Sequence, residues 1–195
     1  MMCHIRIVDS FGFLLSSLEN NTEALKAKHP DNYKLSFPVT YRVLKNCCNF
    51  SDEQITLALQ KNAYPYLWFT DHSKFDRPIT DLDDLFDNNR YEAFTEDVSE
   101  AYKEKFERMK AIYHQVRDAF NFRTVKQYCE LYVAMDVLQL CDEMEFNRET
   151  YRGTHKLDPF SSYGISNYTW KAFQCHNRDS KYKPELFKEG EMNVY

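Results

Sequence analysis

The sequence predicts a helix-dominated α/β (α+β) fold with a few strands, and three stretches carry that prediction. Apolar residues recur three or four positions apart over residues 98–116, and again from Thr124 to Gly153, where the glycine is the expected stop. This spacing places them on one face of a helix. Residues 3–18 alternate apolar and polar side chains and then become apolar, which is typical of a strand or hairpin.

The segments between these stretches predict shorter elements. Residues 19–34 predict a short helix followed by a polar loop. Residues 51–60 begin with Ser51, a favourable N-cap, and predict a second short helix. Residues 61–69 crowd four aromatic side chains around a proline, which favours an extended segment packed against the core. Residues 71–90 are polar, acidic and rich in turn formers, so they predict a surface connection.

Composition restricts the class of protein. A chain of 195 residues, of which 43% are hydrophobic, can bury a core of its own. The 14 Tyr and 15 Phe supply rings for packing and for contact with flat ligands. The net charge of -5 disfavours a free-standing nucleic-acid binder, because affinity for phosphate needs clustered Lys and Arg. A local basic groove remains the alternative.

The six cysteines predict an intracellular protein. They form no Cys-x-x-Cys pair, and no leader with a basic start and an apolar run precedes them. We therefore expect free thiols in a reducing compartment, the cytoplasm or the nucleus. We expect no contact with a membrane, because no apolar run approaches the length that spans one.

Asp136 is the residue that the helix pattern explains least. It follows Tyr132 and Met135 in an apolar stretch, where a buried carboxylate is costly unless a cation or hydrogen-bond donors face it. Tyr132 and Asp136 are four residues apart and so share a helix face. A carboxylate that holds Mg²⁺ beside a phenol that orients water suits metal-assisted phosphodiester hydrolysis. The alternative, favoured by spacing alone, is a buried aspartate satisfied by Arg or backbone donors.

Two neighbouring stretches have a motif pattern: YVAMDVLQLCDEMEFNR at 132–148 and LDPFSSYGISNYTWKAF at 157–173. In order and spacing they resemble YLxxDVLLLADVFExFR and LDPxxYxTxxxLxWxAxL of the protein-primed family B DNA polymerases of linear plasmids, viruses and Polinton-type mobile elements. Residues 5–19 and 60–78 are similar to the family's DSFxF strand and its YPYEY segment. The closing residues 184–195 are similar to the stretch where the exonuclease and polymerase regions of that family meet.

The resemblance implies a domain organisation and an activity. Residues 1–155 would be part of a ribonuclease H-like 3′–5′ exonuclease domain, and residues 156–195 the truncated start of a polymerase domain. The parent protein would be a DNA-directed DNA polymerase that replicates a viral or mobile genome. Its partners would be the single-stranded 3′ end of DNA and, in the full-length family, a terminal protein primer.

The resemblance also implies catalytic roles at matching positions. Asp136 would be the Mg²⁺-binding carboxylate of the third exonuclease motif, and Tyr132 would orient the attacking water. Lys61 matches the lysine of a Lys-x-x-hydrophobic motif and would stabilise negative charge on the scissile phosphate. Without the resemblance, Lys61 would be read as a solvated lysine before a turn.

Three further residues would contact the DNA. Ser17 and Leu18 match a Ser-Leu motif that contacts the single-stranded 3′ end, although Asn21 stands at that motif's later hydrophobic position. Tyr64 occupies the hydrophobic position of the motif that begins at Lys61. Leu18 could equally be a core residue.

The expected catalytic apparatus is incomplete. Two-metal hydrolysis needs carboxylates from several segments, because one aspartate cannot hold two cations about 4 Å apart. The family's Asp-x-Glu and Asn-x-x-Phe-Asp motifs are not found in this chain, and Asp9 matches the strand and not a catalytic motif. We therefore expect negligible nuclease and polymerase activity from this chain alone. The alternatives are a non-catalytic module that binds single-stranded DNA or a protein partner, and a helical domain whose resemblance is coincidental.

Overall fold

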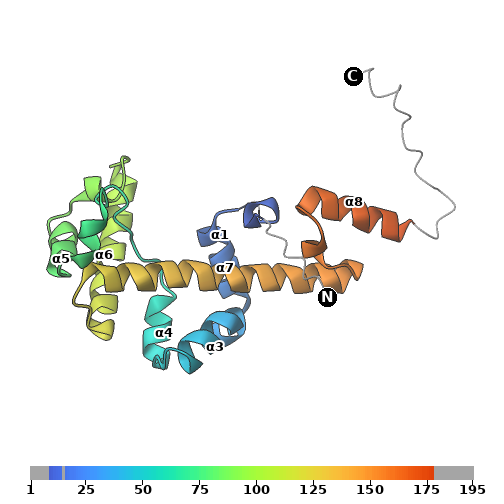
Figure 1. Ribbon diagram of the computed structural model, residues 1–195, viewed down its shortest axis with the longest axis horizontal. Helices are drawn as coiled ribbons and strands as arrows, with labels where there is room; N and C mark the ends of the chain where they lie inside the picture. The colour runs from blue at the N-terminus through green and yellow to red at the C-terminus, as the bar shows by residue number, and fades with distance from the viewer. Residues whose placement is uncertain (1–8, 15, 178–195) are drawn as a thin grey trace, which may run out of the picture. The chain divides into compact units, whose positions relative to one another are not determined.

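The computed structural model describes residues 9–14 and 16–177 (Figure 1). These residues divide into two compact units. The first unit comprises residues 17–143. The second comprises the described part of residues 1–16 together with residues 144–177. The predicted boundary at residue 155 separates an exonuclease-like part from the start of a polymerase domain. It stays a prediction.

Helices account for most of the described residues (Figure 1). Eight are α-helical: α1 (Leu18–Lys28), α2 (Tyr33–Ser36), α3 (Pro38–Asn46), α4 (Asp52–Ala58), α5 (Thr80–Asp87), α6 (Glu100–Phe120), α7 (Val125–His155) and α8 (Ile165–His176). Four short 3-10 turns accompany them: η1 (Ser10–Gly12), η2 (His72–Asp76), η3 (Tyr91–Ala93) and η4 (Pro159–Ser161).

The predicted α/β (α+β) class is wrong, and so is the partial ribonuclease H-like sheet. The described residues contain no β-strand, and an isolated bridge joins Pro78 and Thr124. In the predicted strand, the Asp9 carboxylate accepts a hydrogen bond from the Phe11 backbone N–H and initiates the turn η1. A side chain that satisfies nearby backbone in this way competes with a strand ladder. Residues 3–8 of that predicted strand lie outside the described residues.

The two long helices are confirmed. Helix α6 begins after Ser99, whose side chain accepts from the Tyr102 N–H, and ends at Asn121 in a left-handed conformation with φ 50°. Helix α7 begins where expected, but the predicted stop at Gly153 is wrong because α7 continues to His155. Glycine lowers helix propensity by only about 1 kcal/mol, which the flanking turns of a long helix can offset.

The short helices α1 and α4 are also confirmed. Ser51 caps α4: its hydroxyl accepts from the Gln54 N–H at 3.1 Å, while the Gln54 side chain accepts from the Ser51 N–H at 2.9 Å. This reciprocal pair is a capping box, which satisfies two backbone donors at once. Ser17 caps α1 through a hydrogen bond from the Asn20 N–H.

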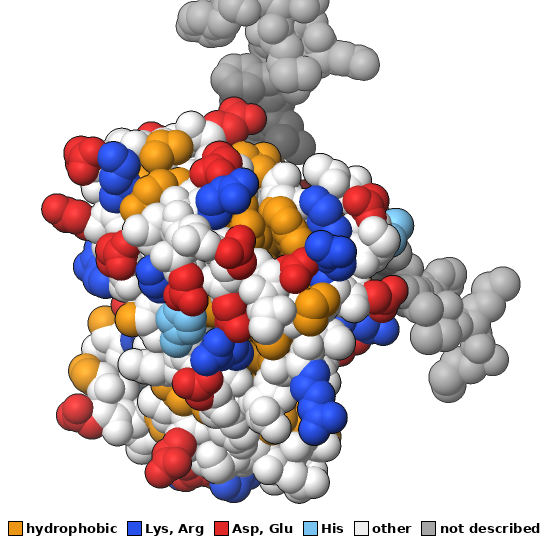
Figure 2. All heavy atoms as spheres, turned by 90° about the vertical axis from the view of Figure 1, so that its left-hand side faces the viewer, with side chains coloured by type: hydrophobic (Ala, Val, Ile, Leu, Met, Phe, Trp, Pro, Cys, Tyr) orange, Lys and Arg blue, Asp and Glu red, His pale blue; other side chains and the backbone are white. Residues whose placement is uncertain are grey.

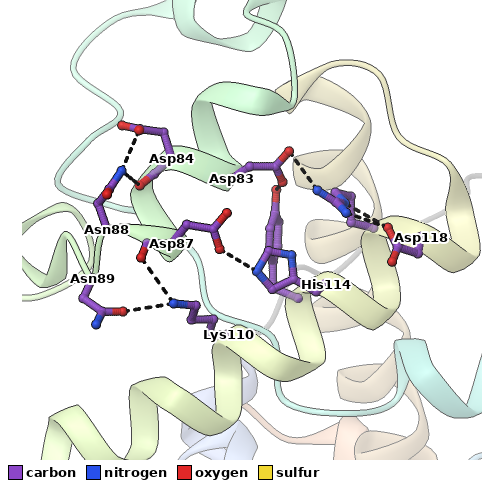
Figure 3. A network of polar contacts seen from close by, with 10 residues as sticks. Asp83, Asp84, Asp87, Asn88, Asn89, Lys110, His114 and Asp118 are labelled. Atoms are coloured by element: carbon purple, nitrogen blue, oxygen red, sulfur yellow. Dashed lines mark hydrogen bonds and ion pairs between the residues drawn. The ribbon is translucent and has the colours of Figure 1, made fainter.

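The surface connection predicted for residues 71–90 is wrong. Leu82, Leu85 and Phe86 are buried on one face of α5, and after Thr80 the other positions are aspartates. Asp83 accepts a hydrogen bond from the Tyr113 hydroxyl at 2.8 Å and pairs with Arg117 of α6 at 2.9 Å (Figure 3). The many acidic residues of this segment favour a surface loop, although three apolar residues among them form the buried face of a short amphipathic helix.

Aromatic side chains dominate the core of the first unit. The Phe86 ring stacks on Tyr113 with centroids 4.0 Å apart and on Phe106 with centroids 5.5 Å apart. Val125 and Tyr128 of α7 are fully buried in the same cluster. Much of the high Tyr and Phe content therefore serves packing.

Residues 61–69 form an irregular segment that is anchored to the core. The Tyr128 hydroxyl donates to the Ala63 carbonyl, and the N–H groups of Leu67 and Trp68 both donate to the Ala93 carbonyl. The segment thereby lies against α7 without pairing as a strand. This position decides where Lys61 and its neighbours lie.

Helix α3 is tied to α7 by Asp142. Its carboxylate accepts hydrogen bonds from the backbone N–H groups of Val39 and Thr40, at 2.7 and 2.9 Å, and from the Thr40 hydroxyl at 2.6 Å. A carboxylate at a helix N-terminus satisfies free backbone donors and complements the helix dipole.

The second unit is held by a close backbone contact and an ion pair. A Cβ on Gly164 would lie 3.1 Å from the Gly12 carbonyl oxygen, so this approach favours glycine. Arg148 of α7 pairs with Asp158 at 2.7 Å, and its guanidinium lies over the Phe160 ring.

Two further features concern the environment of the chain. None of the helices in the described ranges is both long and apolar enough to cross a membrane. The five cysteines at described positions are free thiols: Cys47, Cys48, Cys129, Cys141 and Cys175.

Candidate functional site

Five of the six sequence-predicted site residues line one pocket of about 260 Å³ in the first unit. Three segments far apart in the sequence form its walls: the start of α1, the irregular segment after α4, and the middle of α7. The five residues are Ser17, Leu18, Lys61, Tyr132 and Asp136.

Asp136 is half-buried and makes no ion pair or hydrogen bond with any described residue. Burial raises the pKa of its carboxyl, and the positive charge of Lys61 opposes that shift. The helix around it is less buried than its sequence suggests, because Val133 and Val137 are 54% and 56% exposed. The cation whose charge acts on Asp136 is Lys61, which lines the same pocket, and not an arginine.

Tyr132 lies one turn before Asp136, and its hydroxyl is 3.1 Å from the hydroxyl of Tyr66. Burial, the hydrogen bond with Tyr66 and the negative charge of Asp136 together raise the pKa of the Tyr132 phenol. The phenol stays protonated at neutral pH and can donate a hydrogen bond to a ligand. Tyr66 also lines the pocket, and sequence reasoning missed it although it belongs to the aromatic run around Pro65.

Lys61 is held by a carboxylate that sequence reasoning did not single out. Its ammonium nitrogen lies 3.5 Å from Glu19, and Lys105 of α6 bonds the other oxygen of the same carboxylate at 3.2 Å. Burial raises the pKa of Glu19, but the hydrogen bond from Lys105 and the charges of both lysines outweigh it, so the net pKa is lowered. Glu19 is therefore ionised at neutral pH.

Tyr64 is not brought to the pocket. Its ring packs beside Tyr132, with centroids 4.8 Å apart, and stacks on Phe69 with centroids 5.2 Å apart. Burial and the neighbouring Cys129 thiol raise the pKa of its phenol. Tyr64 supports the wall that positions Tyr132, and its predicted contact with DNA stays a prediction.

Two buried polar side chains also line the pocket. Thr22 and Asn62 are 5% and 8% exposed, and both line the pocket. The Asn62 amide nitrogen donates to the Gln60 carbonyl at 3.3 Å, whereas the Asn62 carbonyl oxygen and the Thr22 hydroxyl have no partner among the described residues.

The residues present do not fit a two-metal centre. Within the part of the chain that the structure describes, no three His, Cys, Asp or Glu side chains are grouped so that they could hold a metal ion. Two of the carboxylates that line the pocket, Glu19 and Glu23, are paired with lysines, so the converging oxygen ligands that Mg²⁺ requires are not assembled around Asp136. The described residues of this site therefore do not support two-metal hydrolysis.

Comparison of the chain with protein-family models, curated proteins and solved structures finds no match.

Proposed function

We propose that this chain derives from a protein-primed family B DNA polymerase and that its pocket holds the 3′ end of single-stranded DNA without cutting it. One observation carries the proposal. The resemblance assigned roles to residues in three separate segments, and five of those residues line a single pocket. Chance similarity gives no reason for those segments to converge.

The chemistry of the pocket suits a nucleotide. Lys61 supplies positive charge for a phosphate, and the rings of Tyr66 and Tyr132 offer surfaces on which a base can stack. Stacking between a base and an aromatic ring contributes about 1–3 kcal/mol and tolerates any base sequence. The site thus favours an end of single-stranded DNA over a particular sequence.

The pocket residues also explain why binding would occur without hydrolysis. Glu19 and Glu23 of the pocket are paired with lysines, whereas Asp136 has no ion pair with a described residue, and the approach of a phosphate to it is repulsive unless a cation intervenes. Lys61 moderates that repulsion, but it does not activate a water molecule. Binding and chemistry are therefore separable at this site.

A protein partner is the second candidate, and the charge distribution favours it. The net charge is -5, and Figure 2 shows acidic and basic side chains interspersed over the face that it displays. An extended nucleic-acid-binding surface would need grouped basic side chains. Under our proposal the DNA contact is confined to the pocket, so it would be short and weak.

The test measures binding of fluorescent single-stranded DNA to the full chain by anisotropy at several salt concentrations. We expect Lys61→Ala to weaken binding and to reduce the salt slope by about 0.7, the value for one phosphate contact. Lys126→Ala, on α7 but away from the pocket, is the matched control. An affinity that does not change with salt concentration would count against the DNA proposal. So would a loss of affinity in Lys126→Ala as large as that in Lys61→Ala.

Hydrolysis is tested separately, with Mg²⁺ and a labelled single-stranded substrate. We expect no release of nucleotides from either the parent chain or Asp136→Ala. Mg²⁺-dependent release that disappears in Asp136→Ala would show that the site is catalytic after all.

A further inference from the structure

Glu19 joins two lysines that come from different parts of the first unit. It lies in the first turn of α1, and its carboxylate bonds Lys61 of the irregular segment and Lys105 of α6. Glu19 and Lys61 both line the pocket. A single anionic group therefore holds two ammonium groups at the edge of the proposed DNA site.

The two lysines of this bridge can exchange the Glu19 carboxylate for another anion at little cost in free energy. The side chains of Glu19, Lys61 and Lys105 are 38%, 48% and 42% exposed. Ion pairs with this much exposure to water contribute little net stability. A phosphate carries the same sign of charge as the carboxylate and offers more acceptor oxygens. Replacing the carboxylate by a phosphate therefore loses little and keeps both ammonium groups satisfied.

We infer that Glu19 occupies the place of a DNA phosphate in the free protein, and that Lys105 is a second phosphate-binding residue that is released together with Lys61 when DNA displaces Glu19. This inference rests on the proposed function and deepens it. It adds two roles that the resemblance did not give: an internal competitor, Glu19, in the pocket and a second cation, Lys105, at its edge.

The neighbouring ion pairs provide matched controls. Glu23, one turn further along α1, also lines the pocket but bonds Lys26 at 2.9 Å. Lys103, one turn from the start of α6, bonds Glu100 and lies outside the pocket. Glu23→Gln changes the net charge as much as Glu19→Gln does, and Lys103→Ala changes it as much as Lys105→Ala does. Neither control removes a residue of the bridge.

The experiment compares the full chain with Glu19→Gln, Glu23→Gln, Lys105→Ala and Lys103→Ala, using labelled single-stranded DNA with a free 3′ end. We expect Glu19→Gln to bind roughly three- to tenfold more tightly than Glu23→Gln, because two lysines lose their internal competitor. We expect Lys105→Ala to weaken binding by a similar factor and to reduce the salt slope by about 0.7, with little change in Lys103→Ala. Circular dichroism verifies that each variant remains helical.

A double variant separates a specific bridge from a general charge effect. If Glu19 acts by holding Lys105, the gain from Glu19→Gln shrinks when Lys105 is already alanine. Unchanged gain in that background, or tightening no greater than that of Glu23→Gln, overturns the inference while leaving the proposed function intact. If no variant binds single-stranded DNA, the proposed function itself fails. Binding by Glu19→Gln alone would support the inference in its strongest form.

Discussion

Two aspartates on α7 show how differently the same side chain can be used. Asp142 is 3% exposed and accepts three hydrogen bonds from the first turn of α3. Asp136 is half-buried, meets no donor in the described structure, and lines a pocket. Because a buried carboxylate persists when donors surround it, Asp142 has a structural explanation. Asp136 has none, which is why the candidate site centres on it.

Asp142→Ala should destabilise the first unit by about 2–4 kcal/mol, since it leaves the N-terminal donors of α3 unsatisfied. Chemical denaturation followed by circular dichroism measures this change. Asp136→Ala is the comparison and should change the free energy of unfolding by less than about 1 kcal/mol. Equal effects of the two substitutions would contradict the roles assigned to them.

Glu143 makes the stability of the first unit depend on pH. Burial raises the pKa of this carboxyl to about 7, against the opposing charge of Lys28 and with a contribution from Asp142. The folded state therefore binds more protons than the unfolded state between the unfolded value near 4.5 and about pH 7. Stability contributed by the protonated form is fully present below about pH 4.5 and is lost as the pH rises to 7.

The Glu143→Gln variant tests this dependence, because glutamine cannot ionise. We expect the free energy of unfolding of the parent chain to fall relative to that of Glu143→Gln as the pH rises from about 4.5 to 7. Parallel pH profiles for the two proteins would refute the assignment.

At the scale of elements, α5 illustrates how an acidic helix can be part of the core. The polar contacts of this helix with α6 are drawn in Figure 3: His114 bonds Asp87 at 3.0 Å, and Lys110 reaches the Asp87 carbonyl and Asn89. Beneath them Phe86 is fully buried. The acidic side chains of α5 form its outer face, and the contacts of Asp83 and Asp87 with α6 hold the two helices together.

Phe86→Ala should cost about 3–5 kcal/mol, because it removes a ring that stacks on two others and leaves a cavity. Leu35→Ala, a truncation at a position that is 60% exposed, should change stability by less than about 0.5 kcal/mol. Thermal denaturation distinguishes the two. A loss below about 1 kcal/mol for Phe86→Ala would mean that α5 is not part of the core.

At the scale of the whole molecule, the first unit contains everything that the proposed function requires. The residues of the aromatic core fall between Ala63 and Cys129 in the sequence. The residues that line the pocket fall between Ser17 and Gln139. The described part of this unit contains helices joined by irregular segments and no sheet on which further carboxylates could be arranged beside Asp136. A binding role therefore agrees with the fold better than a nuclease does.

A chain cut to residues 17–148, which keeps about one extra turn of α7, should fold and unfold cooperatively because its core is complete. It should also bind single-stranded DNA with the affinity of the full chain. Circular dichroism and anisotropy measure the two properties. A truncated chain that remains folded but binds no DNA, while the full chain binds, would place the site elsewhere.

Local patterns in the sequence by themselves determined several elements. The apolar spacing that predicts α6 and α7, and the Ser51 cap of α4, act between residues three or four apart, so no tertiary contact is needed to see them. That the described residues contain no strand could not be predicted in this way. Residues 10–12 alternate like a strand, yet the Asp9 side chain closes a turn over them.

The candidate site depends on contacts between distant parts of the sequence. The pattern at Tyr132 and Asp136 indicated a shared helix face, but their convergence with Ser17 and Lys61 depends on how α1 and the irregular segment pack on α7. The bridge from Glu19 to Lys105 joins positions on separate helices. Contacts between residues far apart in sequence arise from packing of the whole unit, and a single sequence carries no local signal for them.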